Sequence, residues 1–523
     1  MTGHDLWSLV SEHESRHPDR VVLDFAGEEW TWTQLVAAAE SCAAGLAAVG
    51  VRRDGVVCHF APNDAEVIVT MLALVRLGAV ECPVNAGLRG AQLVHVMKHS
   101  EASTIIVDAS LADRVADVLD RCPDLRRIVV RGDCELAADA RSVSYAAIQG
   151  ANGTPLEPFT PPDPTQPLCI IYTSGTTGPA KGVVLPHGFP VEQAHIKMQA
   201  WGLDHNDVLF TALPLYHVNA RFSTLGTALV ADARAAILPS FSARSFWSDV
   251  KRSGATEIGS VGAVASILLL QEPTAQDRDH RVRMMHGAGS LAPSRRQEFE
   301  DRFGLRLVMG FAMTETGHIT TTSPDDPNRY TASGRAVPQF DVAIVNGDDE
   351  QLPVGSVGEL VVRPKRPNAV MTRYHRDPEA TVEAWRNLWF HTGDLAFFDK
   401  QGYLHWTDRK KDAIRHHGEM ISSAELEKIA LQYPGVIECA AIGVPGELGD
   451  QDIKLVVACD RPHVDLRDLV AFCAHRLPDF AAPRYVELVA SLPKGATHKV
   501  EKTKLRAEPF SSGTIDTRQP LPE

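Results

Sequence analysis

The segment Leu168–Gly182, LCIIYTSGTTGPAKG, is the stretch around which the rest of the chain is organised. Its beginning, Leu168–Tyr172, is an apolar run with the length of one buried strand. The residues that follow, Thr173–Gly178, are all small or hydroxyl-bearing, and Lys181 comes shortly after them. The pattern predicts a buried strand that leads into a loop able to approach a polyanion closely.

The composition of this loop suits phosphate groups. Its glycines let backbone N–H groups point at phosphate oxygens, its hydroxyls add neutral donors, and Lys181 supplies a mobile positive charge. The spacing is not the Walker pattern, because Gly175 and Gly178 are only three residues apart and no Ser or Thr follows the lysine. A polar hairpin turn is the alternative that the loop alone leaves open.

Bulk composition narrows the class of protein. A chain of 523 residues indicates a large multilayer body with at least one smaller domain. A net charge of -14 argues against nucleic acid or an anionic membrane surface as the main partner. The first residues lack a signal-length apolar core, and the longest apolar run, Val261–Leu270, is too short to span a bilayer. Nine cysteines without a C-x-x-C pair favour reduced, packed thiols, so we expect a cytoplasmic protein.

Strand and helix patterns alternate along the first part of the chain, which predicts a mostly parallel sheet with ligands beyond the carboxyl ends of its strands. Asp5 is placed to cap a first helix, and Thr33 to cap an Ala-rich helix that stops at Gly50. From about residue 333, short strands with Gly and Pro turns predict a small antiparallel, barrel-like subdomain over 333–410. We therefore expect an α/β protein with a large multilayer N-terminal domain, 1–410, and a small α+β C-terminal domain, 411–523.

The residues resemble the adenylate-forming acyl-CoA synthetases, and the match extends over nearly the whole chain in order. The nearest subgroups are carnitine/crotonobetaine-CoA ligases and medium-chain acyl-CoA ligases. The motifs that carry the resemblance are YTSGTTGPAKG, LPLYH at Leu213, GFAMTETG at Gly310, GELVVR, YHRDPEAT from Tyr374, HTGD at His391, DRKKDAIRHHGEMISSAELE and LPKGATHKVEKTKLR.

The resemblance implies that ATP and a carboxylic acid react to an acyl adenylate and pyrophosphate, with Mg²⁺, and that coenzyme A then takes the acyl group. Glu315 would bind Mg²⁺, Thr314 the α-phosphate, and Lys499 would bridge the substrate carboxylate and the nucleotide. The implied nucleotide-binding residues are Thr173, Ser174, Gly175, Thr176, Thr177, Gly178, Lys181, Gly287, Ala288, Gly289, Phe311, Asp394 and Arg409.

The resemblance also implies that the C-terminal domain is mobile and turns about a hinge at Lys411. Gly418 and His417 would then line a tunnel for the pantetheine arm of coenzyme A, and His217 would be an aromatic gate between tunnel and acyl pocket. The implied acyl pocket includes Asn219, Gly262, Ala263 and Ala312. Its small residues favour a bulky or medium-length acid over acetate, while Arg221 does not decide between a charged and an apolar acid.

The chain departs from the family pattern at two places near the implied chemistry. His498 stands where the family has Gly before the C-terminal lysine, and a side chain there costs on the order of 1–2 kcal/mol if the backbone is left-handed. His417 similarly replaces the first of two glycines. We expect weakened adenylation, while thioester formation from a supplied acyl adenylate survives.

Other readings remain beside this one. The acyl adenylate could pass to a carrier protein or another nucleophile, and the chain could bind nucleotide without turnover. Taken singly, Glu315 and Asp394 are typical of solvated loop acids and turn formers, and His217 of a packed polar residue. The predicted partners are a small carboxylic acid or its adenylate and coenzyme A, with no nucleic acid and no membrane; a homodimer is left open.

Overall fold

The computed structural model describes residues 5–149, 156–173, 180–287, 291, 293–327, 330–416, 419–446, 451–460, 464–478, 481–494 and 500–518. The chain divides into two compact units. Unit 1 comprises Met1–Thr173, Pro179–Asp341 and Arg363–Glu383, and unit 2 comprises Ser174–Gly178, Val342–Val362 and Ala384–Glu523. The predicted boundary at Lys411 falls within unit 2 and stays a prediction.

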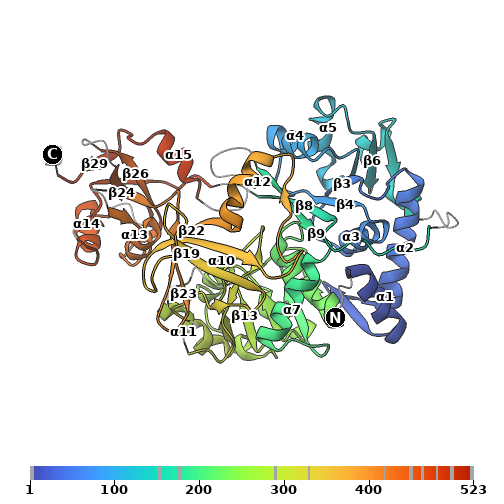
Figure 1. The fold of residues 1–523 in the computed structure, drawn as a ribbon, viewed down its shortest axis with the longest axis horizontal. Helices are drawn as coiled ribbons and strands as arrows, with labels where there is room; N and C mark the ends of the chain where they lie inside the picture. Colours follow the sequence, from blue (N-terminus) through green and yellow to red (C-terminus); the bar gives the residue numbers. More distant parts are fainter. Residues whose placement is uncertain are drawn as a thin grey trace. The chain divides into compact units, whose positions relative to one another are not determined.

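An eight-stranded sheet forms one half of unit 1 (Figure 1). Its strands, in spatial order, are β21 (Arg373–Tyr374), β9 (Lys181–Pro186), β8 (Pro167–Thr173), β4 (Val80–Pro83), β3 (Val56–Phe60), β5 (Thr104–Asp108), β6 (Arg127–Arg131) and β7 (Ser142–Ser144). From β8 to β7 all neighbours pair in parallel, whereas β9 is antiparallel to both β8 and β21. The predicted phosphate loop therefore connects two antiparallel strands. Its chain topology is that of a hairpin, the alternative named above.

A seven-stranded sheet forms the other half of unit 1. Its strands, in spatial order, are β14 (Arg306–Val308), β13 (Met284–His286), β12 (Glu257–Gly259), β10 (Val208–Thr211), β11 (Arg234–Ile237), β1 (Val21–Phe25) and β2 (Glu28–Thr31). All of these pairs are parallel except β1 with β2. Two short hairpins, β15 (Ala312–Met313) with β16 (Gly317–His318) and β17 (Thr320–Thr321) with β18 (Arg335–Ala336), follow β14 in the chain.

The first three helices of unit 1 begin at side chains that cap them. Asp5 caps α1 (Leu6–Arg16), as predicted, by accepting a hydrogen bond from the backbone N–H of Ser8 at 3.0 Å. The prediction of Thr33 as the next cap is wrong: Thr31 caps α2 (Trp32–Ala48), because its side chain and that of Gln34 form a reciprocal capping box. The remaining helices are α3 (Ala65–Leu77), α4 (Gly90–His99), α5 (Ala112–Ala116), α6 (Tyr145–Gln149), α7 (Phe189–Trp201), η4 (Asn219–Gly226), α8 (Thr227–Val230), α9 (Phe246–Ser253), α10 (Gly262–Leu269), α11 (Pro293–Phe303) and α12 (Pro378–Ala384).

Both large sheets are buried on two faces, as parallel sheets require. Ile105 and Val107 of β5 join an apolar cluster with α4 and α5, while Ile106 points to the opposite face and is equally buried. In the seven-stranded sheet, Ile258 and Met285 pack against α9, α10 and α11. The opposite face of this second sheet carries polar side chains such as Glu257 and His286 beside apolar ones such as Leu209 and Met284.

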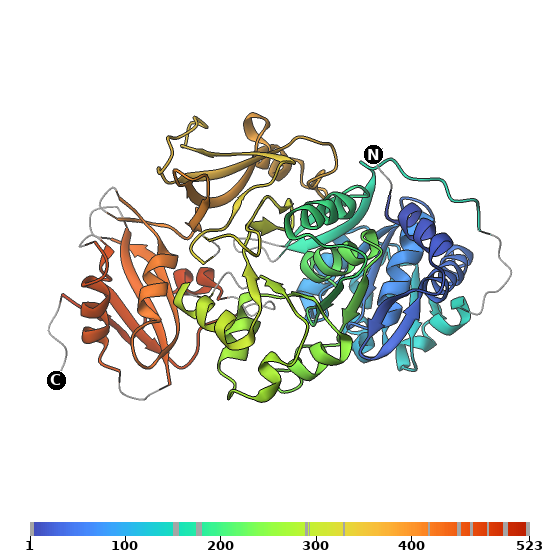
Figure 2. The same ribbon diagram turned by 90° about the horizontal axis from the view of Figure 1, so that it is seen from below.

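Unit 2 contains an open antiparallel sheet, which corrects the expectation of a barrel. Its strands are β19 (Phe340–Val345), β20 (Gly358–Pro364), β22 (Phe390–Phe398) and β23 (Leu404–Arg409), in that spatial order. In the described part of the chain β19 and β23 are the two edges of this sheet and do not pair with each other (Figure 2). Short strands with tight turns are common to barrels and open sheets, so the sequence pattern could not predict closure.

A second sheet of unit 2 follows further along the chain. Its strands are β26 (Val436–Pro445), β27 (Gln451–Cys459), β28 (Tyr485–Val489) and β29 (Thr514–Asp516), preceded by the hairpin β24 (Ile414–His416) and β25 (Glu419–Ile421). Helices α13 (Ser423–Ala430) and α14 (Leu466–Ala474) pack on one face of the sheet and α15 (Lys502–Ala507) on the other (Figure 1). All nine cysteines are free thiols. No helix in the described ranges is long and apolar enough to cross a bilayer.

Candidate active site

Tyr374 joins two residues that were predicted to bind ATP and its metal ion. Its hydroxyl donates a hydrogen bond to Glu315 Oε1 at 3.0 Å, and Lys181 Nζ lies 4.7 Å from the centroid of its ring. Glu315 is 7% exposed, whereas Lys181 lies at the surface. Burial and the nearby Glu315 raise the pKa of Tyr374, so the phenol stays protonated and remains a donor. One side chain thus contacts a cation over its ring and a carboxylate at its hydroxyl group.

Backbone pairing fixes this arrangement. Tyr374 pairs with Val183 across β21 and β9, and the backbone N–H of Met371 donates to the carbonyl of Glu315 at 2.7 Å. Thr173 pairs with Lys181 across β8 and β9, and its hydroxyl reaches the Lys181 carbonyl at 3.4 Å. The strands therefore hold both ends of the phosphate-loop segment; Ser174, Gly175, Thr176, Thr177 and Gly178 lie outside the described residues.

The predicted adenine and α-phosphate residues lie around the hairpin β15–β16. The backbone N–H of Phe311 donates to Thr320 Oγ1 at 3.0 Å, and its ring is half-buried. Thr314 is half-buried in the turn of this hairpin, and Ala312 is exposed. Gly310 has no room for a side chain, since a Cβ atom there would lie 2.5 Å from the Thr320 carbonyl oxygen.

The glycine at position 287 is required by close packing. Its φ is +92°, and a Cβ atom would lie 1.9 Å from the carbonyl oxygen of Ser260. Ala288 and Gly289 lie outside the described residues. Gly262 and Ala263 open helix α10, with Gly262 half-buried and Ala263 exposed.

The segment that carries the predicted gate His217 is held by polar side chains from elsewhere in unit 1. Asn63 Nδ2 donates to the Leu213 carbonyl at 2.8 Å, and Asn63 Oδ1 accepts from the Leu215 N–H at 2.8 Å. Arg221 Nε donates to the Leu215 carbonyl at 2.7 Å. His217 is half-buried, and its ring lies 4.6 Å from that of Tyr216 between centroids. These bonds fix the backbone that immediately precedes the gate residue.

Arg221 is committed to a buried ion pair. Its Nη1 contacts Glu81 Oε2 at 2.5 Å, and Glu81 Oε1 lies 3.0 Å from His59 Nδ1. Burial alone raises the pKa of the Glu81 carboxyl, but Arg221 and His59 outweigh it and hold that pKa below its ordinary value. Arg221 therefore anchors the gate segment, and its pairing with Glu81 argues against a role in binding a charged acid.

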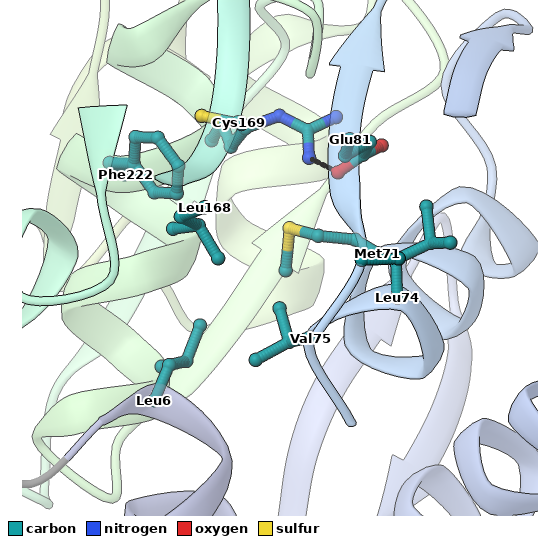
Figure 3. A pocket seen from close by; sticks show the side chains of 10 residues that line it. Leu6, Met71, Leu74, Val75, Glu81, Leu168, Cys169 and Phe222 are labelled. Atoms are coloured by element: carbon teal, nitrogen blue, oxygen red, sulfur yellow. Dashed lines mark hydrogen bonds and ion pairs between the residues drawn. The ribbon is translucent and has the colours of Figure 1, made fainter. Parts of the chain in front are cut away.

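Figure 3 shows this ion pair at the edge of a small cavity. The cavity has a volume of about 10 Å³, which is room for at most one water molecule. Most of its lining is apolar, with Leu6, Met71, Leu74, Val75, Leu168 and Phe222. It is too small for an acyl group and is a packing defect beside a charged pair.

Asp394 and Arg409, both in unit 2, lie opposite each other in β22 and β23. Asp394 Oδ1 accepts a hydrogen bond from Trp406 Nε1 at 2.8 Å and lies 3.3 Å from Arg409 Nε. Asp394 is 3% exposed. Burial raises the pKa of its carboxyl, although Arg409 and Trp406 favour the ionised form. In the described chain Asp394 Oδ2 has no hydrogen-bond partner. Its lone pairs are therefore available to accept a hydrogen bond from a ligand hydroxyl.

Lys411 lies in the turn that leads from β23 to β24, where the N–H groups of Asp412 and Ala413 both donate to the Arg409 carbonyl at 2.9 Å. His417 and Gly418 follow β24 and lie outside the described residues. His498 and Lys499 also lie outside them. The flanking residues Lys494 and Val500 form an antiparallel bridge, and Val500 packs in an apolar cluster of unit 2.

The structure thus brings together Lys181 and Glu315 in unit 1, and Asp394 and Arg409 in unit 2. Sequence reasoning missed Tyr374 and Trp406 as their partners. Tyr374 opens the quoted motif YHRDPEAT, so its place in that motif was a usable signal. Trp406 lies one hairpin away from Asp394, and strand register could have found it.

The fold and the predicted site residues point to an enzyme that binds a nucleotide and a metal ion. The chain belongs to the family of AMP-binding enzymes: residues 10–375 match the AMP-binding enzyme domain and residues 425–499 match the C-terminal domain of AMP-binding enzymes. The family predicted from the sequence motifs is confirmed.

Named relatives are similar to this chain over most of its length, and solved structures share its fold. The crotonobetaine/carnitine–CoA ligase of Salmonella agona (strain SL483) is 27% identical over 463 residues, which cover 88% of this chain and 89% of that protein. The structure of the anthranilate CoA ligase AuaEII in complex with anthranoyl-AMP has a TM-score of 0.87 at 22% identity and covers 97% of both chains. ATP-bound MatB from Rhodopseudomonas palustris has a TM-score of 0.85 at 24% identity, covering 97% of this chain and 99% of that one. The predicted α/β fold is confirmed.

Proposed function

We propose that this AMP-binding enzyme is an acid–CoA ligase, which forms an acyl-CoA thioester while ATP becomes AMP and pyrophosphate. The observation that carries the proposal is the Lys181–Tyr374–Glu315 arrangement, which offers a cation for phosphate oxygens and a carboxylate for a metal ion. Relatives named as CoA ligases support the choice of coenzyme A as acyl acceptor.

In the first step a carboxylate oxygen of the acid attacks the α-phosphorus of ATP, and the bond to pyrophosphate breaks. Lys181 and the donors of the phosphate-loop segment hold the departing phosphates, Thr314 holds the α-phosphate, and Lys499 stabilises the charge that develops between the two anions. In the second step the coenzyme A thiolate attacks the acyl carbon, and AMP leaves. Phe311 stacks on the adenine, and Asp394 accepts from the ribose hydroxyls.

The residues present fit Mg²⁺. This ion is commonly bound by one or two carboxylates together with substrate phosphates and water. Glu315 offers one buried carboxylate, and no cluster of three or more His, Cys, Asp or Glu side chains able to cage a metal occurs in the described residues. When bound, the ion neutralises phosphate charge.

Tracing all products tests the function. The full-length protein is incubated with ATP, Mg²⁺ and a panel of acids, with and without coenzyme A, and AMP, pyrophosphate and thioester are measured. We expect acid-dependent AMP release that coenzyme A accelerates. Parallel reactions with a pantetheine-loaded carrier protein or with hydroxylamine identify a different acceptor. ATP binding by calorimetry without AMP release for any acid would contradict the proposal and indicate a nucleotide-binding protein without turnover.

We also propose that adenylation is the slower half-reaction because of His498. Replacement by Gly removes a side chain that costs on the order of 1–2 kcal/mol in a left-handed backbone, so pyrophosphate exchange should rise about fivefold to thirtyfold in His498→Gly. Thioester formation from a presynthesised acyl adenylate should not change. The matched variant His417→Gly should act on the coenzyme A step instead. Unchanged exchange in His498→Gly would disprove this point.

The remaining assignments complete the proposal. His217 is the gate to the acyl pocket, which includes Asn219, Gly262, Ala263 and Ala312, and Lys411 is the hinge between domains 1–410 and 411–523. Gly418 and His417 line the path of coenzyme A. Free thiols at all nine cysteines support a reducing, cytoplasmic location.

A further inference from the structure

Helix α7 carries a buried polar stripe. Gln193, Lys197 and Trp201 are spaced four residues apart, so they lie on one face of the helix. Their exposed fractions are only 1–3%. Lys197 Nζ donates to the Ser223 carbonyl at 2.7 Å, and burial lowers the pKa of its ammonium group to about 7. The ammonium group of Lys197 therefore lies neither in solvent nor in an apolar core.

The sheet face beneath this stripe is polar at the carboxyl ends of its strands. Gly259 and His286 end β12 and β13 and pair with each other, and Glu257 lies on the same face as Gly259 by strand alternation. The neighbours on the other face, Ile258 and Met285, belong to the apolar core. The carboxyl ends of parallel strands are where ligands bind in sheets of this kind.

A chain of hydrogen bonds leads from this face to the predicted acyl pocket. Glu257 Oε1 lies 2.5 Å from His286 Nδ1, and His286 Nε2 lies 3.2 Å from Asn219 Oδ1. Because Asn219 Nδ2 donates to the Ser260 carbonyl at 2.9 Å, its oxygen must face His286 and accept from Nε2. The amide of Asn219, which is half-buried, is thereby held in one orientation.

Three enclosed polar atoms in this region have no hydrogen-bond partner in the described structure: Glu257 Oε2, Thr224 Oγ1 and His318 Nδ1. The ring of His318 meets those of Trp201 and His286 at centroid distances of 5.6 and 6.0 Å. Thr224 Oγ1 and the His286 ring both lie against Gly259. Enclosing a polar atom without a partner is unfavourable, because the atom gives up its hydrogen bonds to water. Several such atoms together indicate that a partner comes from outside the chain.

These residues adjoin the proposed acyl pocket on two sides. His318 pairs with Ala312 in the hairpin β15–β16, so the two side chains share one face of that hairpin. Asn219 contacts His286 directly. His318 and Asn219 are half-buried, whereas Lys197, Thr224, Glu257 and His286 are at most 3% exposed. The polar cluster, Lys197, Thr224, Glu257, His286 and His318, therefore lies directly behind residues assigned to the pocket.

We infer that the polar cluster is the specificity subsite of the acyl pocket, and that it selects a carboxylic acid whose far end carries a hydrogen-bond donor, a hydroxyl or an amino group. This inference rests on the proposed ligase function. Glu257 Oε2 is an acceptor whenever its carboxyl is ionised, and it needs an N–H or O–H from the ligand. Thr224 and His318 each offer a further acceptor or donor.

Two other classes of acid fit less well. An acid with a hydrocarbon tail leaves Glu257 Oε2, Thr224 Oγ1 and His318 Nδ1 without a hydrogen-bond partner, so their burial stays unfavourable. A second carboxylate brings a negative charge towards Glu257, while His286 is already paired with Glu257 and Lys197 already donates to a backbone carbonyl. Burial and the charge on Lys197 lower the pKa of His318, so this imidazole is neutral and does not compensate a second carboxylate.

Matched acids test the inference. We measure kcat/KM for AMP formation on the full-length enzyme, comparing acids of one carbon skeleton at a time. One set is hexanoate, its 6-hydroxy and 6-amino forms and adipate; the other is benzoate with its hydroxy and amino forms. We expect the donor-bearing acid to exceed the unsubstituted acid by at least about tenfold. In Glu257→Leu this ratio should fall by at least tenfold, mainly through a gain with the unsubstituted acid.

Glu81→Gln is the matched control, because Glu81 is another buried carboxylate beside a histidine. It should lower turnover of all acids alike and leave the ratio unchanged. If Glu257→Leu does not fold, Glu257→Gln is used in its place, and its melting temperature is measured to show that it folds. Equal use of all acids, preference for adipate, or an unchanged ratio in both Glu257 variants overturns the inference and leaves a buried water as the partner of the cluster. Calorimetric binding of the same acids separates this outcome from failure of the ligase function, since selective binding without AMP formation contradicts only the latter.

Discussion

Glu315 in unit 1 and Asp394 in unit 2 are buried to a similar degree, with exposed fractions of 7% and 3%, but their neighbours differ. Glu315 accepts a hydrogen bond from a neutral phenol, that of Tyr374. Asp394 accepts from the indole of Trp406 and lies 3.3 Å from the guanidinium of Arg409. Tyr374 thus gives Glu315 a neutral hydrogen bond, whereas Arg409 places a positive charge beside Asp394.

From this difference we propose different ligands for the two carboxylates. A carboxylate oxygen beside a neutral donor suits a divalent cation that also binds substrate phosphates. A carboxylate beside an arginine has less to gain from a metal ion, but it still accepts hydrogen bonds from neutral hydroxyls. Glu315 therefore suits Mg²⁺ and Asp394 suits ribose, and each of the following variants tests one side of this contrast.

The largest effect is expected for Glu315→Gln. Glutamine keeps the shape and an acceptor for Tyr374 but removes the charge, so adenylation should fall by about 10²–10³-fold and need a higher Mg²⁺ concentration. Pyrophosphate exchange measured across a Mg²⁺ titration reports both changes. Glu300→Gln is the matched control, since Glu300 also accepts from a tyrosine hydroxyl, that of Tyr330 at 2.6 Å. An Mg²⁺ dependence equal to that of the wild type in Glu315→Gln would remove Glu315 as the metal ligand.

The second effect, for Asp394→Asn, should appear in nucleotide binding. Loss of a charged acceptor for ribose costs about 1.5–3 kcal/mol, so KM for ATP should rise about tenfold to a hundredfold while the Mg²⁺ dependence stays unchanged. A titration of initial rate against ATP at saturating Mg²⁺ measures this. Asp399→Asn, in the turn that follows the same strand, should leave KM unchanged. A changed Mg²⁺ requirement in Asp394→Asn would contradict the proposed difference between Glu315 and Asp394.

The sequence predicted both carboxylates and Arg409, but it did not predict Tyr374 or Trp406 as their hydrogen-bond partners, for a physical reason. Glu315 and Asp394 stand inside short motifs whose residue types express their chemistry. Tyr374 reaches Glu315 across 59 residues, a contact made by the pairing of β21 with β9, and strand pairing between distant segments is not written in local periodicity. Trp406 meets Asp394 only through the register of β22 with β23.

The same limit explains the errors in the predicted fold. The alternation of strands and helices predicted parallel sheets correctly, because each crossover is a local pattern. The barrel was wrong since closure depends on whether β19 and β23 pair, which turn signals do not encode. The cap of α2 moved from Thr33 to Thr31 because Gln34 completes a capping box only with the earlier threonine.

Tyr374→Phe tests the orienting role of the neutral donor. It removes the bond to Glu315 but keeps the ring that contacts Lys181, so adenylation should fall only about threefold to tenfold, as expected for one hydrogen bond. Tyr374→Leu also removes the contact of Lys181 with the aromatic face, and should cost more and raise KM for ATP. Pyrophosphate exchange at several ATP concentrations distinguishes the two. Equal losses in both variants would mean that the ring alone matters.

The smallest effect is expected in the stability of Asp394→Asn, as distinct from its function. Burial raises the pKa of this carboxyl in the folded state, so the folded protein binds its proton more tightly than the unfolded chain does. The ionised form therefore destabilises the fold above the folded-state pKa, and this destabilisation disappears as the pH falls below the ordinary value of 3.8. Asparagine mimics the protonated group, so Asp394→Asn should raise the melting temperature at pH 7 by on the order of 1–2 °C, although it weakens ATP binding. The gain should shrink towards zero as the pH approaches the ordinary value. A melting temperature that falls at pH 7 would mean that the bonds to Trp406 and Arg409 outweigh burial, and that Asp394 holds unit 2 together as well as serving its ligand.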